Sequence, residues 1–86
     1  MFLGSVKMSL AFILINTAKG SEDKVVGELK KIKGIVEVHT LFGLHDIIAK
    51  IEIEDEPDAL KDDIIWRIRR IIEVQATTTL IVSDSF

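Results

Sequence analysis

The sequence predicts an α+β fold in which a four-stranded antiparallel sheet carries two helices on one face. The chain has 86 residues, which is the size of one domain. Its apolar residues follow strand spacing in four segments and helix spacing in two, in the order β-α-β-β-α-β. Hydrophobic residues make up 48% of the chain, which is more than one small core can hide, so the composition also predicts self-association.

The chain begins with a predicted strand over residues 9–16, which is apolar on both parities and therefore typical of a strand covered on both faces. A helix is predicted over residues 21–33. Ser21 is a suitable N-cap residue, and Gly34 suits the position just beyond the C-terminus. The apolar stripe of this helix recurs at i, i+4 and i+7 and consists of Val25, Leu29 and Ile32.

Two strands follow, over residues 35–42 and 46–53, and we expect Gly43–Asp46 between them to form a hairpin turn, because glycine can adopt φ > 0. Exposed N–H groups of this turn beside a fixed carboxylate would suit a small zwitterion. One side of the first strand carries Val36, Val38 and Phe42, and the other carries Glu37 and His39. One face of the second carries Ile47, Ala49, Ile51 and Ile53, and the other carries Ile48, Lys50 and Glu52.

A second helix is predicted from Pro57, which suits the first helical position because its missing N–H costs nothing there. Trp66 lies off the apolar stripe of this helix. It could anchor a ligand, but packing or a contact with another subunit is the more common role of such a tryptophan. The stripe consists of Leu60, Ile64, Ile68 and Ile71. A fourth strand spans residues 74–82 and contains three consecutive threonines, which suit a pleated surface.

A right-handed arrangement of these six elements gives a ferredoxin-like plait with both helices on one face of the sheet. The plait covers residues 9–82, between an N-terminal extension over residues 1–8, with Met8 as an alternative start, and a tail over residues 83–86. The uncovered face keeps apolar residues that soluble monomers rarely leave in water. We therefore expect a second copy to cover it, sheet against sheet, as in a dimeric α/β barrel. Polar residues of the third strand would add ion pairs.

Charge and composition argue against several classes of function. The net charge of −3 and the pI of about 5.3 leave no basic surface for a phosphate backbone, so we expect no direct binding to nucleic acid. The absence of cysteine removes disulfides and thiolate nucleophiles and is compatible with a reducing cytosol. The apolar segment 8–18 is too short to span a bilayer and lacks a signal-peptide cleavage site, so no membrane association is expected.

Few residues suggest catalysis. His39 and His45 flank the turn and, with Asp46, could form a base with its orienting acid or half of a metal site. Solvated histidines are the more common outcome of such a pattern. A group of acidic residues could attract a divalent cation but lacks the spacing of a calcium loop, so a solvated acidic face is favoured. That group consists of Glu54, Asp55, Glu56, Asp58, Asp62 and Asp63. We predict no catalytic residue, metal ligand or cofactor.

The βαββαβ order, the motif Phe42-Gly43-x-x-Asp46 before an apolar strand, and the closing threonine-rich strand 75–82 together resemble the ligand-binding (RAM) domain of the Lrp/AsnC transcription regulators. The resemblance covers residues 9–82. It implies a domain that dimerises through its sheet, assembles into rings such as octamers, and binds an amino-acid effector between dimers. In this sequence Gly43, Leu44, His45 and Asp46 match the effector turn of the family, and Thr77, Thr78 and Thr79 match the strand that faces it.

The sequence departs from the gene-regulating members of that family in one respect. Those members carry a helix-turn-helix domain of some fifty residues before the sensor, whereas about eight residues precede the first strand here. The chain thus resembles a stand-alone cytoplasmic sensor, which would modulate transcription by co-assembly with full-length Lrp/AsnC regulators and would not bind DNA itself.

Two other interpretations stay open at this point. One is a small enzyme of the same fold, resembling oxygenases or isomerases, with a substrate cavity between the sheet and the helices. The apolar helix stripes argue against it, because such a cavity would need polar residues. The other is a purely structural assembly module that is indifferent to amino acids. The sequence does not identify the amino acid or the ring size.

Overall fold

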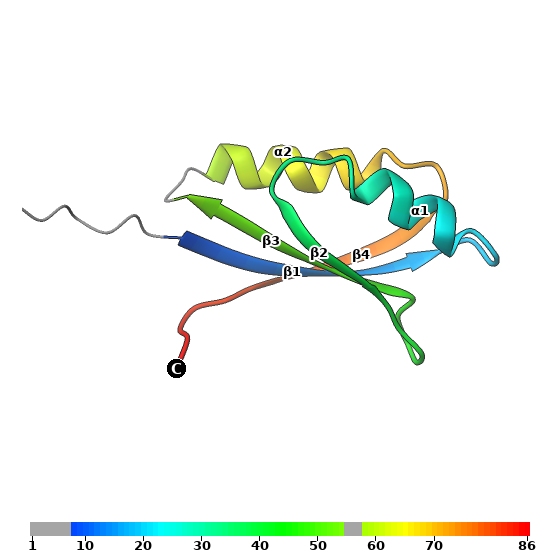
Figure 1. Ribbon diagram of the computed structural model, residues 1–86, viewed down its shortest axis with the longest axis horizontal. Helices are drawn as coiled ribbons and strands as arrows, with labels where there is room; N and C mark the ends of the chain where they lie inside the picture. Colours follow the sequence, from blue (N-terminus) through cyan, green and yellow to red (C-terminus); the bar gives the residue numbers. More distant parts are fainter. Residues whose placement is uncertain (1–7, 55–57) are drawn as a thin grey trace, which may run out of the picture.

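The structure is a computed structural model that describes residues 8–54 and 58–86. The predicted extension before Met8, the acidic loop with Pro57 and the side chain of Leu60 lie outside the described residues. Within those ranges the six predicted elements occur in the predicted order (Figure 1). They are β1 (Met8–Thr17), α1 (Glu22–Leu29), β2 (Ile35–Thr40), β3 (Ile47–Glu54), α2 (Asp58–Arg69) and β4 (Val74–Ile81).

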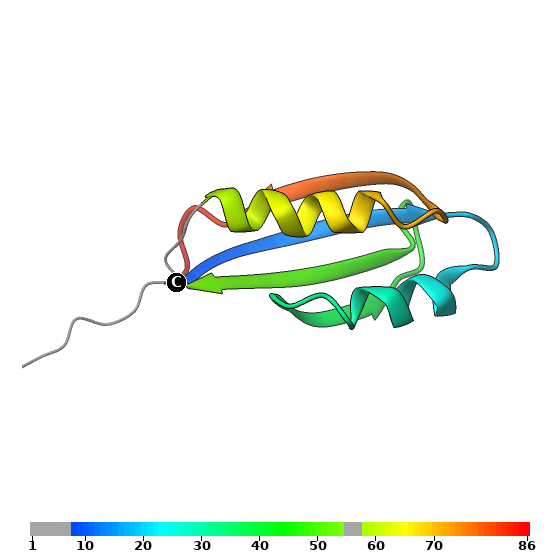
Figure 2. The same cartoon turned by 90° about the horizontal axis from the view of Figure 1, so that it is seen from above.

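The four strands form one antiparallel sheet in the order β2-β3-β1-β4. Both helices lie on the same face of this sheet, as a ferredoxin-like plait requires. Figure 2 shows α2 lying along β1 and β4, while α1 lies on the side of β2 and β3. The predicted fold class is therefore confirmed.

The core lies between the two helices and the side of the sheet that faces them. Every second residue of β1 and β3 points into it, so the predicted alternation of β3 is confirmed. The sheet contributes Ala11, Ile13, Ile15, Ile47, Ala49, Ile51 and Ile53, each no more than 4% exposed. The helices contribute Val25, Leu29, Ile64 and Ile68 from the predicted stripes. Trp66 lies off the stripe as expected and is 59% exposed.

Helix α1 is shorter than the predicted span of residues 21–33, because it ends at Leu29. Beyond this point the N–H groups of Lys31 and Ile32 donate to the carbonyls three residues earlier, at 3.2 and 3.0 Å, so the chain tightens into turns. Gly34 then takes φ +103° and leads into β2. Neither α1 nor α2 is long and apolar enough, over its described residues, to cross a bilayer.

Strand β2 is less regular than its sequence predicts. The register shifts between Ile35 and Glu37, so Val36 is an extra residue in a β-bulge and is 49% exposed. The strand also ends at Thr40, which leaves Phe42 in the turn. The prediction that Val36 and Phe42 share one side of a strand with Val38 is therefore wrong at both ends of β2.

The side of the sheet opposite the helices, here called the outer face, has two unlike halves. Residues paired directly in antiparallel strands share a face, so the register defines rows across the sheet. One outer row contains Glu37, Lys50, Phe12 and Leu80, and the next contains His39, Ile48, Leu14 and Thr78. The outer face thus carries mainly polar residues over β2 and β3, with Ile48 among them, and mainly apolar residues over β1 and β4, which confirms its predicted mixed composition.

Candidate functional site at the β2–β3 turn

The predicted turn is a six-residue loop, residues 41–46, between β2 and β3. It is closed at its base, where the N–H of Leu41 donates to the carbonyl of Asp46 at 2.8 Å. Gly43 lies at its tip with φ +134°, a conformation that side chains disfavour, and an added Cβ would meet nothing within 4 Å. The glycine is therefore needed for the backbone conformation and not for space.

Asp46 ties this turn to the end of β1. Its N–H donates to the carbonyl of Ile15 at 2.9 Å, and its Oδ2 accepts a hydrogen bond from the N–H of Thr17 at 2.8 Å. The register between β1 and β4 shifts between Asn16 and Thr17, and the carboxylate satisfies the Thr17 N–H at this irregularity. Asp46 therefore has a structural role in addition to any contact with a ligand.

Asn16 makes a second tie that the sequence did not reveal. Its Nδ2 donates to the carbonyl of Leu44 at 2.8 Å, and its Oδ1 lies 3.0 Å from Nδ1 of His45. A polar residue at the end of an otherwise apolar strand was the available signal. Asn16 thus holds two residues of the turn at once.

The tip of the turn is apolar and exposed. Phe42 is 107% exposed and Leu44 is 89% exposed, although both are large hydrophobic residues. Such side chains cluster at contacts with other molecules when they are not buried in the chain itself. The turn therefore combines an anchored base with an uncovered apolar tip.

The three threonines of β4 do not point the same way. Thr78 pairs with Leu14, lies on the outer face and is exposed. Thr77 and Thr79 pair with buried isoleucines of β1, so they lie on the helix side, where they are half-buried. A single ligand on the outer face could meet the hydroxyl of Thr78 but not the other two.

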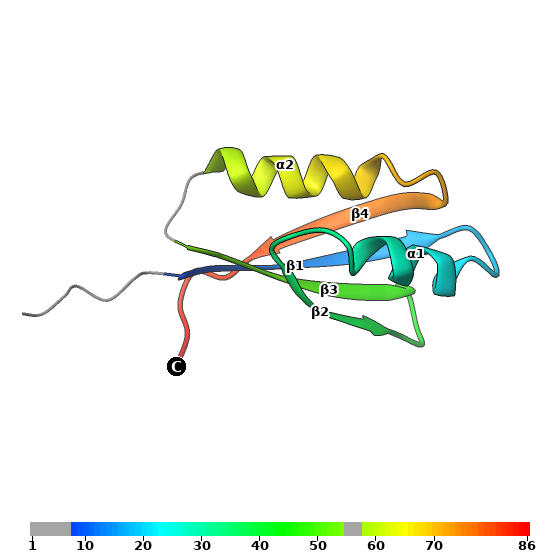
Figure 3. The same ribbon diagram turned by 45° about the horizontal axis from the view of Figure 1, so that its top comes forward.

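The turn and the threonine strand lie at the same end of the sheet. Thr40, Ile47, Ile15 and Thr77 form one row across the four strands. Figure 3 shows the turn, the end of β1 and the start of β4 together at this end. Because β1 lies between them, Ile47 and Thr77 are separated by two strand spacings, about 10 Å. Within one chain, the two parts of the predicted site are near each other but not in contact.

The histidines have separate partners. His39 Nε2 lies 3.1 Å from Oε1 of Glu37 on the exposed outer face, whereas His45 contacts Asn16. The hydrogen bond with His39, and then the charge of Lys50, lower the pKa of Glu37 below its ordinary value. No group of three metal-ligating side chains occurs among the described residues. Neither histidine lies in the core between sheet and helices.

Two open surface clefts among the described residues contain no residue of the turn. One, of about 400 Å³, lies beside the ends of α1 and α2 and is lined by Lys24, Glu28, Arg67, Arg70, Ile71, Ile72 and Glu73. The other, of about 320 Å³, is lined by Arg69, Val74, Gln75, Ala76 and Thr77. The region between sheet and helices is packed with apolar side chains and includes Val25, Leu29, Ile64 and Ile68.

Comparison with known proteins identifies the family. The model of the Lrp/AsnC ligand binding domain matches residues 10–86. The chain belongs to the Lrp/AsnC ligand-binding domain family. Among proteins with curated descriptions, none matches the sequence.

Solved structures of similar proteins agree with this assignment. The structure of FFRP-DM1 is 35% identical in sequence with a TM-score of 0.77, and the match covers 86% of this RAM domain and 97% of that chain. AsnC of E. coli is 27% identical with a TM-score of 0.78, and the match covers 90% of this chain and 52% of AsnC. This RAM domain therefore spans about half the length of AsnC.

A third structure contains a ligand. The feast or famine regulatory protein of M. tuberculosis, complexed with L-methionine, is 20% identical with a TM-score of 0.74. The match covers 91% of this chain and 52% of that protein. At this level of identity the comparison shows the shared fold.

Proposed function

We propose that this RAM domain senses an α-amino acid at the β2–β3 turn and transmits its presence through assembly. The observation that carries the proposal is the turn itself, whose base is anchored to β1 while its apolar tip is exposed. In a family of regulatory ligand-binding domains, such a turn is suited to close on a small ligand and a neighbouring copy together.

The groups available at the turn suit a zwitterion. Backbone N–H groups around Gly43 and the hydroxyl of Thr78 from a neighbouring copy would bind the carboxylate of the amino acid. Oδ2 of Asp46 already accepts from Thr17. We assign the ammonium group of the ligand to the other carboxylate oxygen, which accepts no hydrogen bond from the described residues. His45, held by Asn16, would border the ligand.

The apolar tip favours an amino acid with an apolar side chain. Phe42 and Leu44 are the most exposed hydrophobic residues of the turn, and a ligand side chain between them would shield both. A protein of the same fold binds L-methionine. Methionine is therefore the first amino acid to test.

The outer face supports the dimer that this proposal requires. Phe12, Leu14 and Leu80 form an apolar surface over β1 and β4, next to the charged half with Lys50. Two copies related by a two-fold axis would cover the apolar halves and leave the turns at the ends of the dimer. The proposal requires that Thr78, which lies nearer the turn end of β4 than Leu80, stays at the edge of the covered area. A neighbouring dimer would then bring this end of its β4 to each turn, and a closed set of dimers would form a ring such as an octamer.

The role proposed for the assembled protein is regulatory and not catalytic. Amino-acid binding at the seam between dimers would favour one assembly over another, since a ligand shifts an equilibrium by its difference in affinity for the two states. Co-assembly with a full-length Lrp/AsnC regulator in the cytoplasm would pass that shift to DNA, which this domain would not contact. A purely structural assembly module is the competing proposal.

Native mass spectrometry tests the proposal directly. The protein is measured alone and with an equimolar mixture of the twenty amino acids, with methionine also added singly. We expect even-numbered oligomers that retain one amino acid per turn and change in size when it binds. Oligomers that retain no amino acid would leave the structural module as the better interpretation. A monomer under all conditions would contradict both.

Variants then locate the site by calorimetry with the retained amino acid. Asp46→Asn keeps an acceptor for the Thr17 N–H but removes the charge, and Thr78→Val removes one hydroxyl and preserves the strand. We expect each to weaken binding by roughly tenfold or more, because each removes a hydrogen bond to a charged group. Thr79→Val is the matched control, since its hydroxyl lies on the helix side. Unchanged affinity in the first two variants would exclude this site.

A further inference from the structure

Helix α2 carries a charge pattern that the amino-acid site does not use. In the segment 62–70 two aspartates lie four and three residues before Trp66, and two arginines lie three and four residues after it. These charges are therefore negative on the N-terminal side of Trp66 and positive on its C-terminal side, at matching spacings. Ile64 and Ile68 of the same segment point into the core, which fixes the charged residues and Trp66 on the opposite side of the helix.

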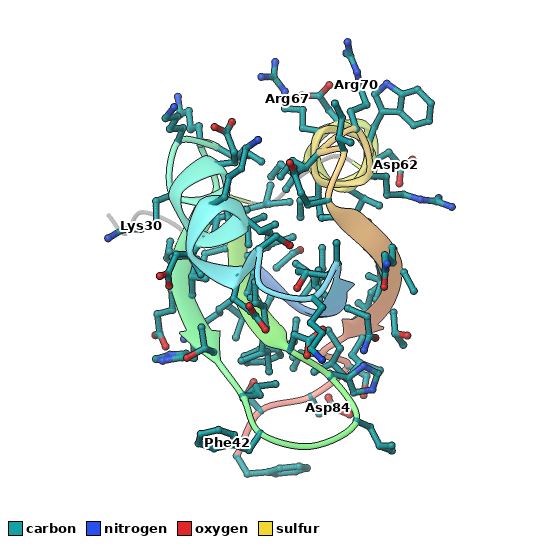
Figure 4. All side chains as sticks on the ribbon, turned by 90° about the vertical axis from the view of Figure 1, so that its right-hand side faces the viewer. Lys30, Phe42, Asp62, Arg67, Arg70 and Asp84 are labelled. Atoms are coloured by element: carbon teal, nitrogen blue, oxygen red, sulfur yellow. The ribbon has the colours of Figure 1, made fainter. Side chains whose placement is uncertain are left out.

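The structure presents this pattern on the surface. Asp62, Asp63, Arg69 and Arg70 are exposed, and Trp66 between them is 59% exposed. The N–H of Arg70 donates to the carbonyl of Trp66 at 3.1 Å, so the helical turn continues through Arg70. Figure 4 shows Arg67 and Arg70 extending from the side of α2 that is farthest from the sheet, with Asp62 on a flank of the helix.

Helical geometry divides these charges between two flanks. Successive residues are rotated by about 100°, so Asp62 and Arg69 lie on one side of Trp66, and Asp63 and Arg70 lie on the other. Each flank therefore has an acid toward the N-terminus of α2 and an arginine toward its C-terminus. Along the helix axis, a charge three residues from Trp66 is about 4.5 Å away and a charge four residues away is about 6 Å away. The acid and the arginine of each flank are therefore at similar distances from Trp66, on opposite sides along the axis.

We propose that this face of α2, named here the Trp66 face, binds the same face of a second copy with the two helices antiparallel. A two-fold axis near Trp66 would bring the acid of each flank beside the arginine of the same flank on the other copy. The two tryptophans would pack against each other at the centre. A parallel arrangement would place like charges together, so the pattern favours the antiparallel pair.

The charge pattern identifies a second copy as the partner. An acidic protein or a nucleic acid would be attracted by the arginines of this face but repelled by Asp62 and Asp63. A basic partner would be attracted by the aspartates but repelled by the arginines. A partner must carry the opposite order of charges, and an antiparallel copy does so. The bond from Arg67 Nε to Asp63 Oδ2, 3.0 Å long, is compatible with this contact because a carboxylate accepts several hydrogen bonds.

The proposed contact is separate from the outer face and would join dimers. A single helix face buries less than the roughly 1,200 Å² typical of the smaller specific interfaces, so the contact is weak between isolated chains. A dimer formed through the outer face would carry two Trp66 faces on its outside. Two such contacts per dimer act together, which strengthens assembly without further interactions.

Charge-swap variants test the proposal. The acidic variant carries Arg69→Glu and Arg70→Glu, and the basic variant carries Asp62→Lys and Asp63→Lys. Sedimentation velocity over a concentration series should show assemblies larger than a dimer for the wild type. Each variant alone should need at least a tenfold higher concentration for the same assembly, whereas a mixture of the two should assemble at least as readily as the wild type, because every acid then faces a base.

A full swap with all four substitutions is the matched control. It has the net charge of the wild type and restores the complementary pattern in reverse, so we expect assembly within about threefold of the wild type. Circular dichroism checks that α2 folds in each variant. Unaltered assembly of the acidic and basic variants, failure of both the mixture and the full swap, or a wild type that stops at the dimer would overturn the proposal.

Discussion

Asp46 shows how one side chain serves both the fold and the candidate site. Its carboxylate satisfies the N–H of Thr17, and its backbone closes the turn against Leu41 and Ile15. Asn16 adds a second support through Leu44 and His45. A turn held in this way is ordered before any ligand arrives, which reduces the conformational entropy that binding must overcome.

The two glycines near the ends of β2 are expected to respond differently to substitution. Gly34 and Gly43 both have positive φ, but a Cβ on Gly34 would lie 2.5 Å from Cδ1 of buried Ile64, whereas Gly43 has open space. We expect Gly43→Ala to lower the free energy of unfolding by about 1–2 kcal/mol and Gly34→Ala by about 2–5 kcal/mol. Denaturation with urea measures both, and equal losses would contradict the steric argument.

Removal of the Asn16 side chain should loosen the turn and leave the core intact. Asn16→Ala deletes the contacts with Leu44 and His45. Loss of each hydrogen bond lowers the free energy of unfolding by about 0.5–1.5 kcal/mol. We expect faster amide hydrogen exchange confined to residues 41–46. Gln75→Ala, at an exposed position of β4, is the control. Faster exchange throughout β1 and β3 would show that Asn16 supports the sheet instead.

The two helices are held to the sheet by different numbers of turns and by different contacts. Helix α2 packs two isoleucines into the core, while α1 contributes Val25 and Leu29 from only two turns of helix. The short α1 gains a further tie at its surface, where Lys24 Nζ lies 2.8 Å from Oε2 of Glu73 in the loop before β4. This ion pair joins the first helix to the loop before the last strand, across 49 residues of sequence.

The stabilising effect of that ion pair should depend on pH. The hydrogen bond with Lys24 lowers the pKa of Glu73 below 4.5, and the same bond raises the pKa of Lys24 above 10.5. The contribution is therefore present between these values and is lost as the pH falls through the lowered pKa of Glu73. We expect Glu73→Gln to lower Tm slightly at pH 7, and the difference from the wild type to shrink as the pH falls through the lowered pKa of Glu73. A difference that persists in acid would assign the effect to packing.

The helices cover one side of the sheet and leave the other side uncovered. The proposed dimer would hide this uncovered side. Phe12, Leu14 and Leu80 remain partly exposed on the outer face of a single chain. This surface can account for the hydrophobic excess in the composition. The Trp66 face lies on the opposite side, so the two surfaces could be occupied simultaneously.

A charged substitution on the outer face should weaken the proposed sheet-to-sheet dimer. Leu80→Asp would bury a carboxylate against apolar residues, and we expect it to weaken the dimer at least thirtyfold, corresponding to about 2 kcal/mol. Ile72→Asp, which changes a 92% exposed residue on the helix side, is the matched control and should leave the dimer intact. Size-exclusion chromatography with light scattering measures both. An unaffected Leu80→Asp dimer would place the interface elsewhere.

Local sequence patterns were sufficient for the order of the elements and for the core. The alternation of Ile47, Ala49 and Ile51 and the stripe of Val25 and Leu29 each depend on neighbours within one element, so periodicity predicts them. The position of Gly43 at a turn is local in the same sense. The motif that resembles the RAM domain, Phe42-Gly43-x-x-Asp46, is also a short run of consecutive residues and could be recognised without the fold.

Contacts between distant segments decided the rest. The bulge at Val36, the division of the threonines with only Thr78 on the outer face, and the contacts of Asn16 depend on how β1, β3 and β4 are aligned. That alignment is set by pairing across the sheet, and no short stretch of sequence contains it. Asp46 was a candidate from its place beside Gly43, but its bond to Thr17 required two segments 29 residues apart to meet.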